Sequence, residues 1–155
     1  NFGWALLPTG TDGVDWYSSN NSVTWVPRLS IDYYIPNGDQ HTNAPTSAAT
    51  ALPIANNAST AFGTLETAGD RDVFQFVLTQ ASSVTLNLAS FGASTLNTYL
   101  RLYSSTGMLV AENNDSNSTT NSKLTLSLSA GTYYVSVASD LDTGLGDYWL
   151  DLLIS

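Results

Sequence analysis

Apolar side chains recur two residues apart in many short segments of this chain, and this spacing most tightly limits its fold. The segments are Val84/Leu86/Leu88, Leu100/Leu102, Leu124/Leu126/Leu128, Tyr133/Val135/Val137 and Tyr148/Leu150/Leu152. A β-strand points alternate side chains to opposite faces, so each segment is typical of a strand with one buried face. Stretches rich in Gly, Asn, Asp and Ser separate them. The pattern predicts an all-β fold, an antiparallel β-sandwich of jelly-roll type.

The chain divides near Ile35 to Gly38, where a proline and an Asn-Gly turn signal open a polar stretch. We interpret 1–36 as terminal strands of a preceding β domain or as an assembly segment, 37–50 as a linker or lead-in loop, and 51–155 as the sandwich. The upstream strands are rich in Trp and Tyr and would expose apolar area and unpaired edges. They therefore pack on the downstream sandwich, belong to a larger domain, or add to a sheet of another chain.

Charge and composition exclude several classes of partner. Thirteen acidic residues against four basic ones give a net charge of −9, which repels nucleic acid and anionic membranes. No run of eighteen apolar residues is present, so we expect no membrane insertion. The chain has no cysteine, so a small exported domain would depend on packing or on a hard metal ion. It opens at Asn1 without an initiator methionine or a signal peptide, and we expect a processed piece of a longer, secreted or cell-surface protein.

Two carboxylates lead directly into one predicted strand. Asp70 and Asp72 stand one residue apart, and Phe74, Phe76 and Leu78 follow with strand spacing. At a loop-to-strand junction the twist can turn both carboxylates toward one calcium ion, with loop carbonyls as further ligands. The alternative is that both carboxylates accept backbone hydrogen bonds in a turn. The sequence leaves both open.

Three segments, Gly69 to Leu78, Ala130 to Val137 and Gly146 to Leu152, together resemble the bacterial pre-peptidase C-terminal domain family. These are calcium-binding β-sandwiches appended to secreted hydrolases, and the resemblance extends over about residues 37–155. It implies calcium as the cofactor. The ligands it implies are Asp39, Asn43, Asp70 and Asp72. The acidic residue usual before the asparagine is Thr42 here.

A second resemblance concerns the start of the chain. Residues 1–36, from Gly3-Trp4 through Trp16-Tyr17 to the strand ending in Ile31-Asp32-Tyr33, are similar to the closing strands of DNRLRE-type carbohydrate-binding domains.

Catalysis finds little support. The only histidine, His41, lies in the predicted linker, and cysteine nucleophiles are absent. Asp70 and Asp72 are too close in sequence to serve as the separated acid and base of a glycosidase. The run from Asp140 to Gly144 lacks the ligands of an EF-hand loop and indicates a solvated turn. We predict that the chain is not an enzyme.

Aromatic residues give the stronger functional lead. If Leu100 and Leu102 face the core, their neighbours on the strand face outward. By the same alternation, Tyr134 and Trp149 face outward on their own strands. The predicted ligand-binding residues are Tyr99, Arg101, Tyr103, Tyr134 and Trp149. Flat rings on a rigid sheet suit a sugar ring or a proline-rich chain, and some collagen-binding relatives in the resembling family use tyrosines on an outer face. The alternative is that these rings only pack across strands.

Two hypotheses follow. In the first, the chain is a calcium-stabilised, non-catalytic accessory domain that attaches an exported protein to an extracellular polysaccharide or fibrous protein. In the second, residues 1–36 complete a sheet in a neighbouring copy and build a filament or surface layer by self-association. A third, weaker hypothesis is an intramolecular chaperone or removable extension of a protease.

Overall fold

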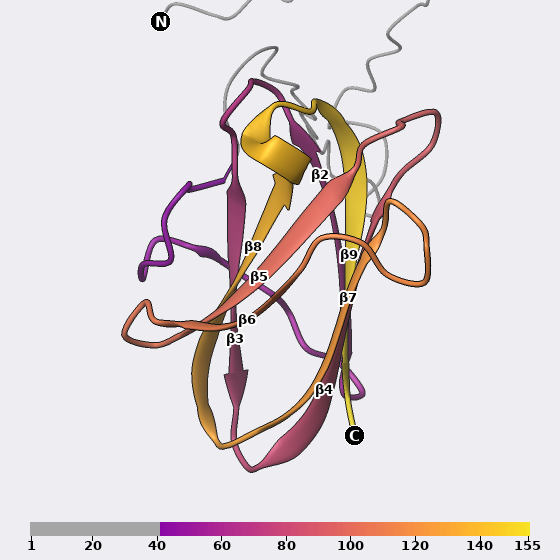
Figure 1. The fold of residues 1–155 in the computed structure, drawn as a ribbon. Helices are drawn as coiled ribbons and strands as arrows, with labels where there is room; N and C mark the ends of the chain where they lie inside the picture. The colour runs from indigo at the N-terminus through magenta and orange to yellow at the C-terminus, as the bar shows by residue number, and fades with distance from the viewer. Residues whose placement is uncertain (1–40) are drawn as a thin grey trace, which may run out of the picture. The chain divides into compact units, whose positions relative to one another are not determined.

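The computed structural model describes residues 41–155, which form nine strands in two sheets (Figure 1). The strands are β1 (Thr50–Ala51), β2 (Ala58–Leu65), β3 (Asp72–Leu78), β4 (Ser82–Ser90), β5 (Thr98–Ser104), β6 (Leu109–Asn113), β7 (Ser122–Leu128), β8 (Gly131–Ser139) and β9 (Gly146–Ile154). A short 3₁₀ turn, η1 (Asp140–Asp142), joins the last two. Predictions that concern residues 1–36 and Asp39 lie outside the described residues.

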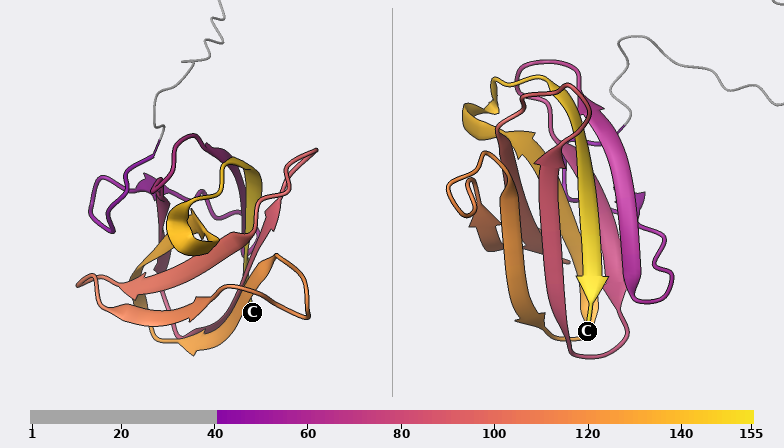
Figure 2. Two further views of the ribbon diagram at one scale, coloured as in Figure 1. Left: turned by 45° about the horizontal axis from the view of Figure 1, so that its top comes forward. Right: turned by 90° about the vertical axis from the view of Figure 1, so that its right-hand side faces the viewer.

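The two sheets pack as a sandwich, which confirms the predicted all-β fold. One sheet has five strands in the order β1-β3-β8-β5-β6, and the other has four in the order β2-β9-β4-β7 (Figure 2). Neighbouring strands are antiparallel except for β1 and β3, which are parallel. Within residues 41–155, no helix has the length and apolar character needed to cross a membrane.

The core lies between the sheets and consists of the alternating side chains that the sequence pattern identified. The buried members include Phe74, Phe76, Leu86, Leu88, Leu100, Leu102, Val135, Val137, Leu150 and Leu152. Each comes from one parity of its strand, so the opposite parity faces outward. Burial of apolar area at roughly 25 cal/mol per Å² is the main stabilising term for such a core.

Strand β2 was not predicted, because its pattern is inverted. Three of its four inward positions hold the small residues Ser59, Ala61 and Gly63, the fourth holds Leu65, and Phe62 points outward. Gly63 pairs with Tyr148 of β9, and a Cβ atom at Gly63 would lie 2.2 Å from the Tyr148 hydroxyl oxygen. The small side chains of β2 therefore make room for the large buried ring of the next strand.

The segment before β2 runs along the edge of the five-stranded sheet. The backbone N–H of Val73 donates to the carbonyl of Thr42 at 3.0 Å, and that of Leu52 donates to the carbonyl of Gln75 at 2.8 Å. Between them, Thr50 pairs with Phe74 in the parallel register of β1. Residues 41–50, predicted as part of the linker, thus lie against β3.

Candidate functional site

The first predicted site lies at one end of the sandwich, where β3 begins. Asp72 is fully buried on the inward face of β3, and its Oδ2 accepts a 2.5 Å hydrogen bond from the hydroxyl of Tyr148. Tyr148 belongs to β9 of the opposite sheet. The bond therefore joins the two layers across the interior.

The hydroxyl of Tyr148 stays protonated far above neutral pH. Burial is the largest cause, and the neighbouring carboxylate of Asp72 is the next; together they raise the pKa of Tyr148 well above its ordinary value of 10.0. The charges of Asp70 and Glu66 act in the same direction. An ionised phenol here would lie out of water among carboxylates, which is unfavourable on both counts.

Asp70 and Asn43 take part in backbone contacts around this end. One carboxylate oxygen of Asp70 accepts the N–H of Glu66 at 3.0 Å, which closes the loop between β2 and β3. The side-chain oxygen of Asn43 accepts the N–H of Arg71 at 2.7 Å. The charges of Glu66, Asp70 and Asp72 thus all act on Tyr148, while Asn43 bonds to the backbone of Arg71.

Calcium fits the donor chemistry of this end only in part. Carboxylate and amide oxygens are the ligands that calcium prefers. However, within residues 41–155 no three Asp, Glu or His side chains are grouped so that they could hold one metal ion. One oxygen each of Asp72 and Asn43 is engaged by Tyr148 and by the Arg71 N–H. A complete site at Asp70 would therefore need oxygens from outside these carboxylates.

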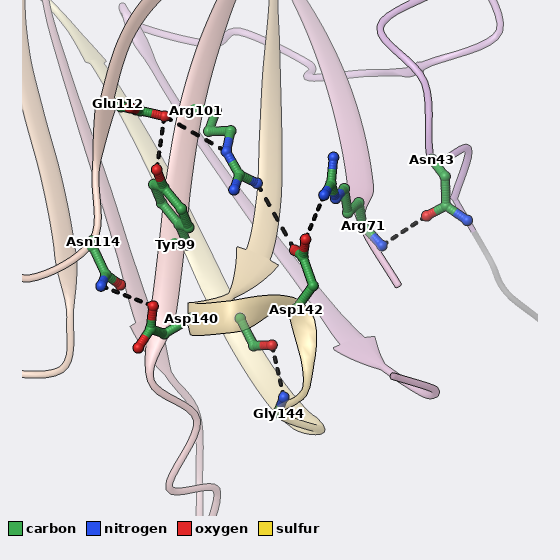
Figure 3. A network of polar contacts seen from close by, with 10 residues as sticks. Asn43, Arg71, Tyr99, Arg101, Glu112, Asn114, Asp140, Asp142 and Gly144 are labelled. Carbon is green, nitrogen blue, oxygen red and sulfur yellow. Dashed lines mark hydrogen bonds and ion pairs between the residues drawn. The ribbon is translucent and has the colours of Figure 1, made fainter. Parts of the chain in front are cut away.

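A second polar network covers the outer face of the five-stranded sheet near η1 (Figure 3). Asp142 accepts a hydrogen bond from the guanidinium of Arg71, which raises the pKa of Arg71 above its ordinary value. The other oxygen of Asp142 lies 3.9 Å from Arg101. Arg101 in turn lies 3.7 Å from Glu112. The turn that the sequence indicated as solvated is thus joined to Arg71, just before β3, and to Arg101 of β5.

This network occupies the predicted platform. Tyr99, Arg101 and Tyr103 do point outward, as their parity predicted. The guanidinium carbon of Arg101 lies 3.7 Å from the centroid of the Tyr99 ring, and the Tyr99 hydroxyl donates to Glu112 at 2.7 Å. That hydrogen bond raises the pKa of Tyr99 above its ordinary value. The cation and the ring are therefore engaged with each other (Figure 3).

The structure does not bring all five predicted ligand-binding residues together. Tyr134 is only 7% exposed, because Ala49 of the segment before β1 and Val73 pack with it and Tyr103 packs against this cluster. Trp149 lies on β9, in the four-stranded sheet, and points away from the core on that side. The single platform expected from strand parity is therefore corrected, because parity separates inside from outside but does not assign a strand to a sheet.

Trp149 has different aromatic neighbours, which the sequence analysis missed. Phe62 pairs with it across β2 and β9 and is 59% exposed. Phe91, just after β4, is 48% exposed, and its ring meets that of Phe62 edge to face at a centroid distance of 5.0 Å. Two features of the sequence could have indicated these neighbours: the outward parity of Trp149 and the small residues on the inward side of β2. We call Phe62, Phe91 and Trp149 the aromatic face; the sheet that carries it is turned to the viewer in the right-hand view of Figure 2.

Two shallow hollows adjoin the aromatic face. The first, of about 260 Å³, is lined by Phe62, Gly63, Thr64, Phe91, Asp147 and Tyr148. The second, of about 240 Å³, is lined by Trp149, residues of β4 and β7, and the loop between β6 and β7. Both are smaller than the usual pocket for a small molecule, which exceeds about 300 Å³.

The fold and these surfaces define an all-β sandwich module whose polar and aromatic features lie at its rim and outer faces. Residues 70–139 match the family described as the bacterial pre-peptidase C-terminal domain. The match confirms, over that segment, the resemblance predicted from the sequence. Such domains are non-catalytic accessory domains found in secreted bacterial proteases. The resemblance of residues 1–36 to DNRLRE-type domains stays a prediction.

Solved structures agree on the fold. The pre-peptidase C-terminal domain of collagenase from Bacillus anthracis superimposes with a TM-score of 0.57 at 19% identity, over 72% of this chain and 99% of that domain. A periplasmic inhibitor of g-type lysozyme from Aeromonas hydrophila superimposes with a TM-score of 0.53 at 16% identity, over 69% of this chain and 96% of the inhibitor. No curated protein matches the sequence. At such identities the likeness concerns the fold alone.

Proposed function

We propose that residues 41–155 are an attachment module of an exported bacterial protein, which binds an extracellular polymer through the aromatic face. The observation that carries the proposal is the exposure of Phe62 and Phe91 next to Trp149 on one sheet surface. Large aromatic side chains gathered on the outside of a soluble domain cost solvation free energy and commonly mark an interaction surface. Export is supported by the presence of the matching family in secreted proteases.

The rigidity of the sheet supports this function. Phe62 and Trp149 are fixed by the paired strands β2 and β9, and their rings lose little conformational entropy when a ligand stacks on them. The adjoining hollows are open and shallow, so they suit an extended polymer better than an enclosed small molecule.

Retention on insoluble polymers tests the proposal. The full chain would be mixed with cellulose, chitin, an acidic polysaccharide gel and collagen fibrils, and the bound fraction measured after washing. We expect retention on at least one polymer and loss of that retention in Phe62→Ala. The matched control is Val77→Ala, because Val77 is exposed on β3, which belongs to the other sheet. A folded chain that no polymer retains would overturn the proposal.

We further propose that calcium stabilises the end of the sandwich near Asp70. The support is the oxygen-only chemistry of Asp70 and Asp72, which with Asp39 and Asn43 are the ligands that the resemblance implies. The carboxylate of Glu66 adds to the negative charge at this end. An ion that binds only the native state at one hundred times its dissociation constant adds about 2.7 kcal/mol. Thermal melting with a chelator and with added calcium measures this directly. An equal midpoint in both conditions, in the wild type and in Asp70→Asn, would contradict it.

A second candidate function is assembly into a filament or surface layer. The observation that favours it is β6, an outer strand of the five-stranded sheet that, within residues 41–155, pairs only with β5. Next to and within this edge, Met108, Leu109 and Val110 are exposed apolar residues. An uncovered apolar edge is a template for an added strand. The donor would be residues 1–36 of another copy.

Light scattering over a wide concentration range tests assembly. We expect growing particles in the wild type and a monomer in Val110→Lys, because a charge on an edge strand opposes strand addition. A wild-type chain that stays monomeric at every concentration excludes the filament and leaves the attachment function standing.

A further inference from the structure

We infer that the aromatic face binds an uncharged polysaccharide chain lying across β2, β9 and β4. The inference rests on the proposed attachment function and specifies its ligand class. Three independent features of the four-stranded sheet point to this class: the shape of the surface, its charge, and the hydrogen-bonding character of its polar groups.

The shape favours a chain that lies across the sheet. Phe62 and Trp149 are direct neighbours on β2 and β9, and Ala89 of β4 pairs with Trp149 on the other side. Ala89 is only 7% exposed, and it lines the second hollow together with Trp149. The first hollow lies beside Phe62 and Phe91. Aromatic rings and hollows thus continue across three strands, which matches an extended ligand with repeating flat units.

The charge of the surface disfavours anionic polymers. The four strands of this sheet carry two carboxylates, Asp147 and Asp151, and one ammonium group, Lys123. The sheet therefore has a surplus of negative charge, and the whole chain has a net charge of −9. A polyanion would be repelled over its whole length, whereas an uncharged chain pays no such cost.

The polar groups next to the rings suit sugar hydroxyls. Thr60 donates its hydroxyl to Asp151 at 2.6 Å, and Thr64 donates to Asp147 at 2.7 Å. These bonds hold both carboxylates in place on the face, and each carboxylate has capacity for further donors. A sugar hydroxyl can donate to a carboxylate and can also accept from Lys123. The aliphatic face of a pyranose ring stacks on aromatic rings by dispersion and C–H contacts.

A proline-rich or collagen-like chain fits the same groups less well. Such a chain has few N–H donors and presents mainly carbonyl oxygens, which cannot pair with Asp147 or Asp151. Strand addition is also unavailable at β9, because its backbone groups pair with β2 and β4 on both sides. The observations therefore favour an uncharged glycan over a peptide chain.

The experiment compares polymers and variants in one assay. The full chain, the double variant Phe62→Ala/Trp149→Ala and the single variant Phe62→Ala would be tested on cellulose, chitin, an insoluble β-1,3-glucan, alginate gel and collagen fibrils, at low and high salt. The control variant is Val77→Ala/Leu141→Ala, which removes two exposed apolar side chains outside the aromatic face. Thermal melting verifies folding, and the single variant keeps the test valid if the double variant does not fold.

We expect retention on at least one uncharged polysaccharide, independent of salt, with affinity at least tenfold weaker in the aromatic variants and unchanged in the control. Retention on collagen alone or on alginate alone would overturn the assignment to an uncharged polysaccharide, while the attachment function stands. Glycan retention that survives the aromatic substitutions would overturn the assignment to this face. Retention on no polymer would overturn the attachment function itself.

Discussion

Gly63 and Tyr148 show how one residue without a side chain fixes the position of a large one. They face each other across β2 and β9, and the phenol ring extends over the space that a Cβ atom at Gly63 would fill. From there its hydroxyl reaches Asp72 in the other sheet. The interlayer hydrogen bond therefore depends on Gly63, whose missing side chain leaves the space that the Tyr148 ring occupies.

Gly63→Ala is expected to destabilise the domain. In a strand that has space, replacing glycine by alanine stabilises by roughly 0.5–1 kcal/mol. Here the new methyl group would lie 2.2 Å from the Tyr148 oxygen, and overpacking of this kind costs about 1–3 kcal/mol. Urea unfolding measures the difference. Gly63→Ala should lower the free energy of unfolding much less in a Tyr148→Leu background than in the wild type. Equal losses in both backgrounds would show that Tyr148 is not the cause.

Tyr148 also predicts a dependence of stability on alkaline pH. Its pKa is raised in the folded state, so above pH 10 the unfolded chain loses this proton while the folded chain keeps it. The contribution of Tyr148 is fully present below about pH 10 and declines above it, by up to about 1.4 kcal/mol per pH unit. Tyr148→Phe should lose about 2 kcal/mol at neutral pH, the value of a hydrogen bond to a carboxylate, and should show a shallower alkaline decline.

Urea unfolding at several pH values from 8 to 11 measures this effect. Val84→Ala is the control, since it removes buried apolar volume from the same core without removing a titrating group. An alkaline decline in Tyr148→Phe as steep as in the wild type would refute the assignment to Tyr148.

Leu141 predicts a stabilising substitution. It is 81% exposed and has a φ of 56°, a left-handed conformation that is unfavourable for leucine. Asparagine tolerates this conformation, so Leu141→Asn should raise the free energy of unfolding by about 0.5–1 kcal/mol. Leu145→Asn is the matched control, because Leu145 is exposed but has no positive φ. Equal thermal midpoints for Leu141→Asn and the wild type would contradict the claim that the backbone at Leu141 is strained.

At the scale of the elements, strand periodicity predicted those strands whose inward side chains are large. Residues 148–152 and 84–88 alternate clearly, and both form central strands, β9 and β4. Strand β2 was not predicted because three of its four inward positions, Ser59, Ala61 and Gly63, hold small residues and Phe62 faces water, which leaves Leu65 as its one large inward residue. Strand β6 was not predicted because its apolar residues Leu109 and Val110 are adjacent and both exposed, so they do not alternate with polar residues.

The site was predictable to a smaller extent, for a related reason. The sequence identified Asp70 and Asp72 as a rim pair, and both are buried at the start of β3. Tyr148, the hydrogen-bond partner of Asp72, lies 76 residues further along the chain, and local spacing cannot indicate such a contact. The pairing of Arg71 with Asp142, 71 residues apart, is of the same kind. Only the order of strands in the two sheets brings these residues together.

At the scale of the whole molecule, the net charge of −9 predicts a response to salt. Like charges oppose the compact state, and the Debye length falls from about 30 Å at 0.01 M to about 3 Å at 1 M salt. The thermal midpoint should therefore rise with sodium chloride in the presence of a chelator. Differential scanning calorimetry measures it, with a neutral osmolyte at matched osmolality as the control. A midpoint that falls with salt would mean that attractive ion pairs outweigh the repulsion.

The bond between Tyr148 and Asp72 has a practical consequence. It joins the two sheets without a disulfide bond, in a chain that contains no cysteine. A scaffold of this kind can be produced in a reducing cytosol and labelled at a single introduced thiol. Outward positions such as Thr60, Phe62 and Asp151 could then be randomised to select new binders, since none of them belongs to the buried cluster that holds the sandwich together.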